Sequence, residues 1–198
     1  MRRLIDWKSF GVPLTAGVDE AGRGCLAGPV YAAAVILHPT SRIRGCTDSK
    51  LLCPEVRTSL ATKIKSEALS WAIGTASVEE IELINILQAS LLAMRRAVMA
   101  LNFAPLLLLI DGNQKIEGLW TQMTITGGDL RCLPISAASI LAKTERDRFM
   151  VELHEKYPSY ELAKHKGYAT PEHRRAIAEH GPAIIHRKTF AGVKEFLK

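Results

Sequence analysis

Apolar runs of two different periods alternate along the chain and define its expected elements. Short runs rich in β-branched and aromatic residues predict strands over residues 14–20, 29–37, 71–76 and 122–126. Apolar residues spaced three or four positions apart predict helices over residues 54–68, 79–101, 136–156 and 171–181. We expect the second of these helices to consist of two pieces. Strands separated by helices indicate an α/β domain.

Two of the apolar runs lead directly into acidic residues. After Pro105, the sequence L-L-L-L-I reaches Asp111 without interruption, as is typical of a strand buried on both faces. Another run ends in the adjacent pair Asp19 and Glu20. In a continuing strand these two side chains would point to opposite faces. The glycines at 22 and 24 favour an end of the strand here, so that both carboxylates turn toward one site.

The acids suggest a metal site. Ligands of open α/β sheets bind at the carboxyl ends of the strands, where we expect Asp19, Glu20 and Asp111, with Asp129 after two glycines as a fourth candidate. Carboxylates gathered without partners raise one another's pKa. Mg²⁺ or Mn²⁺ would relieve the repulsion, and paired divalent ions often serve displacement at phosphorus. The alternative, separate strand-end and turn residues, is about as plausible for any one acid and less so for the joint pattern.

A nucleotide-binding loop is a poorer interpretation of the same stretch. The segment G-R-G-C-L-A-G spaces its glycines differently from the dinucleotide fingerprint, and no G-K-[ST] follows. Two acids directly before the loop would repel a pyrophosphate. We therefore reject this alternative.

Charge is concentrated toward the C-terminus. The net charge is +6, and residues 131–198 carry 13 basic and 8 acidic side chains, a balance of +5. A basic region beside a nearly neutral body suggests a polyanionic partner. The four cysteines have no metal-ligand spacing, and no apolar run is long enough to span a membrane. We expect a soluble, cytoplasmic protein.

Five motifs occur in an order that is familiar. They are G-V-D-E-A-G-R-G-x-L-A-G-P-V from Gly17, D-S-K from Asp48, I-D-G-N from Ile110, S-A-A-S-I-L-A-K from Ser136 and H-K-G-Y from His165. Together they closely resemble bacterial ribonuclease HII, from about residue 16 to residue 187. Several motifs are too long for a chance match. The related HIII enzymes carry an N-terminal extension, for which an acid pair at position 19 leaves no room.

The resemblance implies a ribonuclease-H-like fold: a central mixed sheet flanked by helices, in a single domain over residues 1–198 whose part 158–198 is a basic, helical, substrate-binding region. It implies a monomeric endoribonuclease that cuts the RNA strand of RNA–DNA hybrids and single ribonucleotides embedded in DNA, as in ribonucleotide excision repair. Paired Mn²⁺ or Mg²⁺ ions would leave 5′-phosphate and 3′-hydroxyl ends.

The family's functional residues map onto positions of this chain. The four catalytic, metal-binding acids are then Asp19, Glu20, Asp111 and Asp129. The segment Gly22, Arg23 and Gly24 resembles the reader of the 2′-hydroxyl, and Tyr168 matches the tyrosine that packs on the neighbouring deoxyribose. Lys50 and Lys143 are candidate phosphate contacts, although a solvated surface lysine is about as plausible for each.

The chain also departs from the family pattern. Cys25 replaces a usual proline and Leu51 a frequent second lysine, while Lys188 and Thr189 stand where Arg and Ser are common. None of these departures removes a catalytic group. A non-catalytic module that binds hybrids and keeps the fold is the remaining alternative, and the four intact acids argue against it. The histidines at 165, 173, 180 and 186 are too loosely spaced for zinc, and we expect them at the surface or at helix caps.

Overall fold

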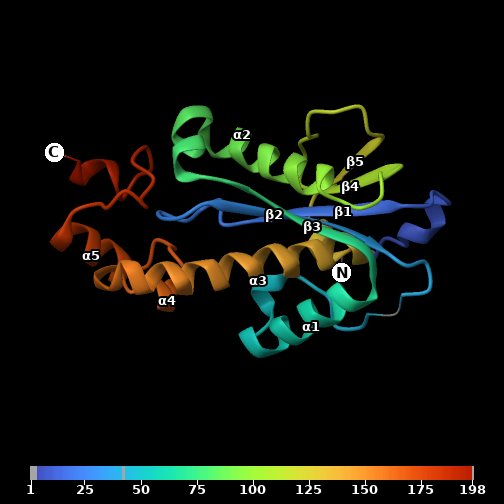
Figure 1. The fold of residues 1–198 in the computed structure, drawn as a ribbon, viewed down its shortest axis with the longest axis horizontal. Helices are drawn as coiled ribbons and strands as arrows, with labels where there is room; N and C mark the ends of the chain where they lie inside the picture. Colours follow the sequence, from blue (N-terminus) through green and yellow to red (C-terminus); the bar gives the residue numbers. More distant parts are fainter. Residues whose placement is uncertain (1–3, 42, 198) are drawn as a thin grey trace.

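A five-stranded mixed sheet with helices on both faces forms the body of the molecule (Figure 1). The computed structural model describes residues 4–41 and 43–197. The sheet has the order β3–β2–β1–β4–β5. Its strands are β1 (Thr15–Ala21), β2 (Val30–Leu37), β3 (Ala68–Ala76), β4 (Leu107–Asp111) and β5 (Gln122–Ile125). The α-helices are α1 (Pro54–Glu67), α2 (Val78–Met99), α3 (Leu133–Lys156), α4 (Leu162–His165) and α5 (Pro171–His180).

Two kinds of strand pairing meet at β1. On one side, β1 pairs antiparallel with β2, which pairs antiparallel with β3. On the other side, β1 pairs in parallel with β4, and β4 with β5. The carboxyl ends of β1 and β4 therefore lie side by side at one edge of the sheet. The predicted α/β class with a mixed central sheet is confirmed.

The alternation of side chains along the strands produces two cores. Even-numbered residues of β2, such as Ala34 and Ile36, pack under α2 with Leu108 of β4. Odd-numbered residues, such as Val35, pack toward α3 with Leu109. In Figure 1, α2 lies on one face of the sheet and α3 on the other. Both faces of the central strands are covered, which explains their almost unbroken apolar sequence.

The helices differ from the sequence prediction mainly at their ends. The expected break in α2 occurs at Asn85, whose positive φ of 66° interrupts the helix. Helix α3 begins at Leu133 rather than at Ser136, and Cys132 is its N-cap residue. The hydroxyl of Ser136 instead donates to the carbonyl of Asp129, 2.5 Å away. It thereby ties the first turn of α3 to the segment that carries an acid.

The C-terminal part packs as a smaller third cluster against the far end of α3. Leu26, Met150, Leu162 and Ile177 belong to this core. Its short helix α4 lies where the sequence predicted only a polar loop. In the described part of the chain, none of the helices has the length and apolar character required to cross a membrane.

Gly17 permits the close contact between β1 and α3, and its replacement tests this packing. A Cβ atom at this position would lie 2.0 Å from the carbonyl carbon of Pro134. Gly17→Ala should therefore lower the free energy of unfolding by about 2–3 kcal/mol, because backbone must move to admit the methyl group. Denaturant unfolding measures this change. Gly24→Ala is the control, since a Cβ there meets no atom within 4 Å. An equal loss in both variants would contradict the packing argument.

Candidate active site

The acid pair lies within β1, not beyond its end. Asp19 pairs with Ala33 and Glu20 with Ala32 in the β1–β2 ladder, which continues to Ala21. The expectation that both carboxylates turn toward one site at the end of the strand was therefore wrong. Their side chains leave the sheet on opposite faces, as alternation in a strand requires.

Asp19 points to the α3 face and is almost fully enclosed. Its side chain is only 5% exposed. Its carboxylate accepts from the amide of Glu20 at 2.7 Å and hydrogen-bonds to the hydroxyl of Ser139 on α3. Burial raises the pKa of Asp19 well above its usual value, and the charges of Glu20 and Asp111 raise it further. A carboxylate that is buried close to two others is destabilised, and binding of a proton or of a cation relieves this.

Glu20 points to the α2 face and lines a small hollow. The hollow has a volume of about 30 Å³, and Arg23, Asp111 and residues of α2 also line it. Arg23 pairs with Glu20 at 3.3 Å between Nη1 and Oε1. Burial raises the pKa of Glu20, Arg23 lowers it, and Asp111 raises it again. Asp111 thus acts on both members of the acid pair.

Asp111 occupies the matching place on the neighbouring strand. Val18 pairs with Ile110, and Asp19 and Asp111 each follow directly. The carboxylate of Asp111 accepts from the amide of Gly128 at 2.7 Å. Asp129, the next residue, has its pKa raised by burial and by the charges of Asp111 and Asp48. The hydrogen bond at Gly128 therefore brings the fourth acid to the same edge of the sheet.

The four acids form an electrostatically connected group around Asp111. In residues 4–41 and 43–197, however, no three or more His, Cys, Asp or Glu side chains lie close enough to hold a metal ion as they stand. The donor chemistry nevertheless fits a hard divalent cation. All four donors are carboxylates, and burial, together with the charge of Asp111, raises the pKa values of Asp19, Glu20 and Asp129, which favours a bound cation.

The glycine-rich segment after β1 makes a turn under tight constraints. Gly22 has a φ of +98°, and a Cβ atom there would lie 2.0 Å from Nε of Arg146. Only glycine fits such a position. Gly24 meets no such limit, and Arg23 is exposed apart from its pair with Glu20. Of the three residues predicted to read the 2′-hydroxyl, Gly22 has a clear steric reason to be glycine.

Tyr168 lies against the same segment, and one of the two predicted lysines lies beside it. Its backbone bridges to Cys25, and the ring is half-buried. Lys143 places its Nζ 5.0 Å from the ring centroid and pairs with Asp147 at 2.6 Å. Lys143 is itself only 8% exposed. A lysine that contacts phosphate is expected to be exposed and unpaired, and Lys143 is neither.

Lys50 has a different environment. It is exposed in the turn of residues 49–51, where Asp48 caps the turn through the Lys50 amide. Its charge lowers the pKa of Asp129. Lys50 thus stands near the acidic edge, with its ammonium group open to solvent.

Sequence reasoning missed several residues that surround the site. Arg146 and Arg187 are fully buried and donate to backbone carbonyls of the segment between β1 and β2. Charged residues are rarely buried, and the sequence around these two does not distinguish them from surface arginines. The S-A-A-S motif did contain a signal for Ser139, because two serines three positions apart in a helix lie on the same face.

The prediction of surface or capping histidines was wrong for two of the four. His173 and His186 are fully buried, with their Nε2 atoms 3.2 Å apart. His165 stacks on His173 with ring centroids 4.3 Å apart. Burial lowers the pKa values of His173 and His186 to about 4. These neutral rings fill the C-terminal core, where their ring nitrogens also satisfy backbone groups.

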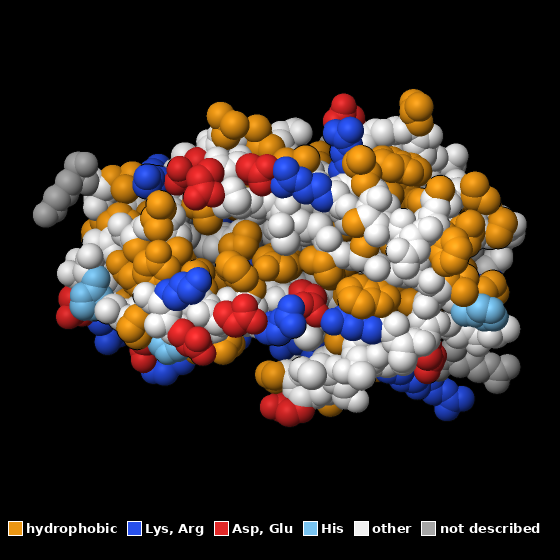
Figure 2. All heavy atoms as spheres, viewed as in Figure 1, with side chains coloured by type: hydrophobic (Ala, Val, Ile, Leu, Met, Phe, Trp, Pro, Cys, Tyr) orange, Lys and Arg blue, Asp and Glu red, His pale blue; other side chains and the backbone are white. Residues whose placement is uncertain are grey.

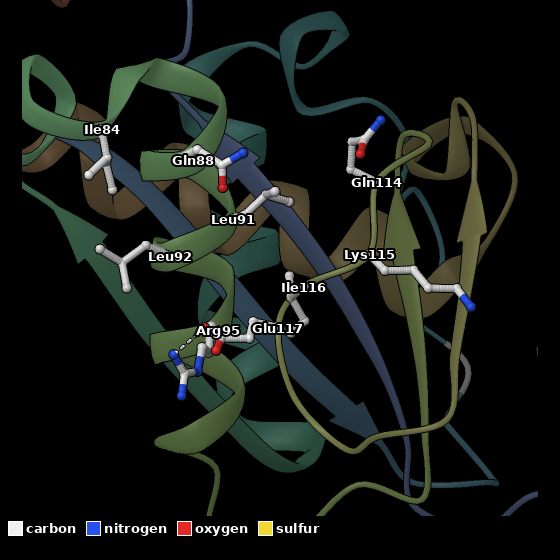
Figure 3. Close-up of a pocket in the computed structure, with 9 residues that line it drawn as sticks. All are labelled: Ile84, Gln88, Leu91, Leu92, Arg95, Gln114, Lys115, Ile116 and Glu117. Carbon is white, nitrogen blue, oxygen red and sulfur yellow. Dashed lines mark hydrogen bonds and ion pairs between the residues drawn. The ribbon is translucent and has the colours of Figure 1, made fainter.

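A wider groove runs beside the small acidic hollow. It has a volume of about 580 Å³ and lies between α2 and the loop after β4. Figure 3 shows Gln88, Leu91 and Arg95 of α2 facing Gln114 and Glu117 of the loop, with Arg95 bonded to Glu117. None of the predicted site residues lines this groove, although Leu91 and Gln114 also border the hollow at Glu20.

Surface charge is mixed on the face seen in Figure 2. Lys and Arg side chains alternate there with Asp and Glu, including over the C-terminal part. Ion pairs between neighbouring residues, such as Lys164 with Glu161 and Arg148 with Glu145, also occur in the C-terminal third of the chain. The excess of basic residues toward the C-terminus therefore forms no single positive patch on this face.

Comparison with known proteins places the chain in a family. A family model described as Ribonuclease HII matches residues 16–193. Ribonuclease HII of Bordetella pertussis is 51% identical over 183 residues, which cover 92% of this chain and 91% of that protein. Ribonuclease HII of Nitrosospira multiformis is 52% identical, with 93% of each chain covered.

Solved structures agree on the fold. Ribonuclease H2 from Pyrococcus horikoshii OT3 superposes with a TM-score of 0.77 at 25% identity, covering 92% of this chain and 96% of that one. A structure of the PCNA:RNase HII complex from Archaeoglobus fulgidus gives a TM-score of 0.76 at 24% identity, over 93% and 97%. The expected ribonuclease-H-like fold is thus confirmed. With the family match over nearly its whole length, the chain belongs to the Ribonuclease HII family and is a hydrolytic, divalent-metal-dependent ribonuclease that acts on RNA-containing nucleic acid.

Proposed function

We propose that this ribonuclease cuts the RNA strand of RNA–DNA hybrids and also cuts at single ribonucleotides embedded in duplex DNA, leaving 5′-phosphate and 3′-hydroxyl ends. The observation that carries the proposal is the group of acids around Asp111 at the ends of adjacent strands. Beside this group lies a turn in which only glycine fits at position 22. Chemistry and recognition would then share one edge of the sheet.

The acids divide into positions with different environments. Asp19 and Asp111 follow paired residues on adjacent parallel strands, and they would hold the cations most rigidly. Glu20 and Asp129 are less buried than Asp19 and would complete the ligand set. Mg²⁺ or Mn²⁺ bound in pairs would supply an activated water and stabilise the leaving oxygen.

Recognition would come from the turn after β1 and from Tyr168. RNA differs from DNA by the 2′-hydroxyl, which a backbone close to the minor groove can contact. Gly22 and Gly24 add no side chain next to the acids, Arg23 adds a cation between them, and Tyr168 would offer a ring face to the adjoining sugar. Lys50, in its exposed turn near Asp129, would approach a phosphate, whereas Lys143 would act by holding the ring of Tyr168.

The chain would work as a single domain. The part from 158 to 198 packs on α3 through its own core and reaches the turn after β1 through Tyr168 and Arg187. In this proposal it shapes the substrate site and forms no separate unit. We propose a monomer, because all the predicted site residues lie on one chain.

A duplex with one embedded ribonucleotide tests the proposed activity. With Mg²⁺ or Mn²⁺ we expect a single cut at the ribonucleotide and no cut in the all-DNA duplex of the same sequence. Chelator should stop the reaction. Asp111→Asn should reduce the rate by at least about 100-fold, because this carboxylate interacts with all three others. Cleavage that persists in chelator, or a fully active Asp111→Asn enzyme, would contradict the proposal.

Asp19→Asn tests the electrostatic conflict independently of catalysis. Because the folded-state pKa of Asp19 is raised, the folded protein binds this proton more tightly than the unfolded chain, whose pKa is about 3.9. The protonated carboxyl therefore contributes stability that is fully present below the unfolded-state pKa. This stability is lost as the pH rises through the folded-state pKa, because the buried carboxyl then ionises. In chelator at neutral pH, Asp19→Asn should raise the melting temperature by roughly 3 °C or more, and the difference should vanish near the unfolded pKa.

The variant keeps the oxygen that accepts from the Glu20 amide, so the comparison isolates the charge. Exposed Glu155→Gln on α3 is the control and should change the melting temperature little. Adding Mn²⁺ should stabilise the wild type more than Asp19→Asn. A variant that is less stable than the wild type throughout the pH range in chelator would argue against the repulsion.

A further inference from the structure

The segment from Gly22 to Pro29 is held from below by arginine side chains that are distant in sequence. Arg187 donates through Nε and Nη2 to the carbonyl of Gly28, at 3.0 and 2.8 Å. Its Nη1 donates to the carbonyl of Arg23 at 2.8 Å. Arg146 donates to the carbonyls of Ala27 and Pro29, each at 3.1 Å. Two guanidinium groups thus fix four carbonyls of one turn.

Backbone hydrogen bonds complete the attachment. The amide of Leu26 donates to the carbonyl of Gly167, and the amide of Gly28 donates to that of Ile185, both at 2.8 Å. The amide of Arg187 donates back to the carbonyl of Leu26 at 2.8 Å. The C-terminal part therefore forms a short ladder along the turn, and Arg187 lies at the point where this ladder meets the segment next to the acids.

These two arginines are unusual in their surroundings. Both are fully buried, and in residues 4–41 and 43–197 neither forms a salt bridge with a carboxylate. Burial and, to a smaller extent, the charge of Arg146 lower the pKa of Arg187 to about 9. Buried cations without counter-charges are costly, and packed apolar residues of similar volume are often as stable. The presence of two such groups under one turn indicates that the orientation of the carbonyls that they bind matters.

We propose that Arg187 is a positioning residue for ribonucleotide recognition. By fixing the carbonyls of Arg23 and Gly28, it sets the direction of the peptide groups that address the 2′-hydroxyl. Arg23 in turn pairs with Glu20, so the same contact relates the recognition turn to the acids. Arg187 lies beneath the turn, fully buried, and acts through Arg23 and Gly28 without touching substrate. The inference rests on the proposed function.

Arg187→Lys is the sharpest variant because it retains the positive charge. An ammonium group on a flexible stem cannot reproduce the planar fork that reaches two carbonyls at once. Arg187→Gln provides a second variant that keeps a donor without the charge. The matched control is Arg175→Lys, an exposed arginine on α5. Melting curves select conditions in which each protein is folded.

The experiment measures three constants for each folded protein. They are kcat and KM on a duplex with one ribonucleotide, and the inhibition constant of the all-DNA duplex as a competitor. For Arg187→Lys we expect KM to rise about tenfold, because hydrogen bonds from a charged group to the turn are lost. The inhibition constant of the all-DNA duplex should stay within about twofold, since phosphate contacts do not depend on the turn. Arg175→Lys should match the wild type.

The remaining outcomes separate this inference from its alternatives. A lower kcat with unchanged KM would mean that Arg187 serves the chemical step and not ribonucleotide recognition, and it would overturn the inference. An equal rise in KM and in the inhibition constant would assign Arg187 to general duplex binding and would also overturn it. A wild-type enzyme that does not cut this duplex would overturn the proposed function itself, whatever the variants do.

Discussion

The structure depends on a conflict between carboxylates at the edge where β1 and β4 run in parallel. Parallel pairing of Val18 with Ile110 makes Asp19 and Asp111 neighbours, and the protein encloses Asp19 beneath α3. Desolvation and like charge both oppose ionisation there. Close packing of α3 requires glycine at position 17, so the burial of Asp19 follows from the backbone approach of two elements. In the proposed function, a divalent cation bound by these acids would resolve the conflict.

The turn after β1, which we propose for recognition, rests on buried positive charge and not on buried negative charge. The turn after β1 contributes backbone and glycine, and its shape is imposed by Arg146 and Arg187 from α3 and from the C-terminal part. The acids Asp19 and Glu20 precede the segment of residues 22–29, and the buried Arg146 and Arg187 bind carbonyls toward its other end. Arg23 joins them through its backbone carbonyl and its pair with Glu20. The C-terminal part thus contributes to the site by holding this segment.

The sequence predicted most of the sheet because apolar alternation and continuous runs are local signals. The run before Asp111 and the run before Asp19 indicated both strand ends and the edge they share. The bounds of β1 were predicted within one residue, but the direction of its two carboxylates was predicted wrongly, because the ladder with Ala32 and Ala33 of β2 continues past them despite the nearby glycines. Long-range pairing of this kind leaves no mark in the local sequence. For the same reason, buried Arg187 and His173 could not be distinguished from surface residues.

Proton release on cation binding tests the central claim most directly. If burial and like charge raise the pKa values of Asp19 and Glu20, Mn²⁺ must displace protons from them when it binds at a pH where they are still protonated. Calorimetric titration in two buffers of different ionisation enthalpy, carried out at a low and at a high pH, measures the number of protons released. The account predicts proton release at the low pH that falls as the pH rises, because these carboxyls are more fully ionised at high pH. Mn²⁺ binding with no release at either pH, or no binding at all, would contradict it.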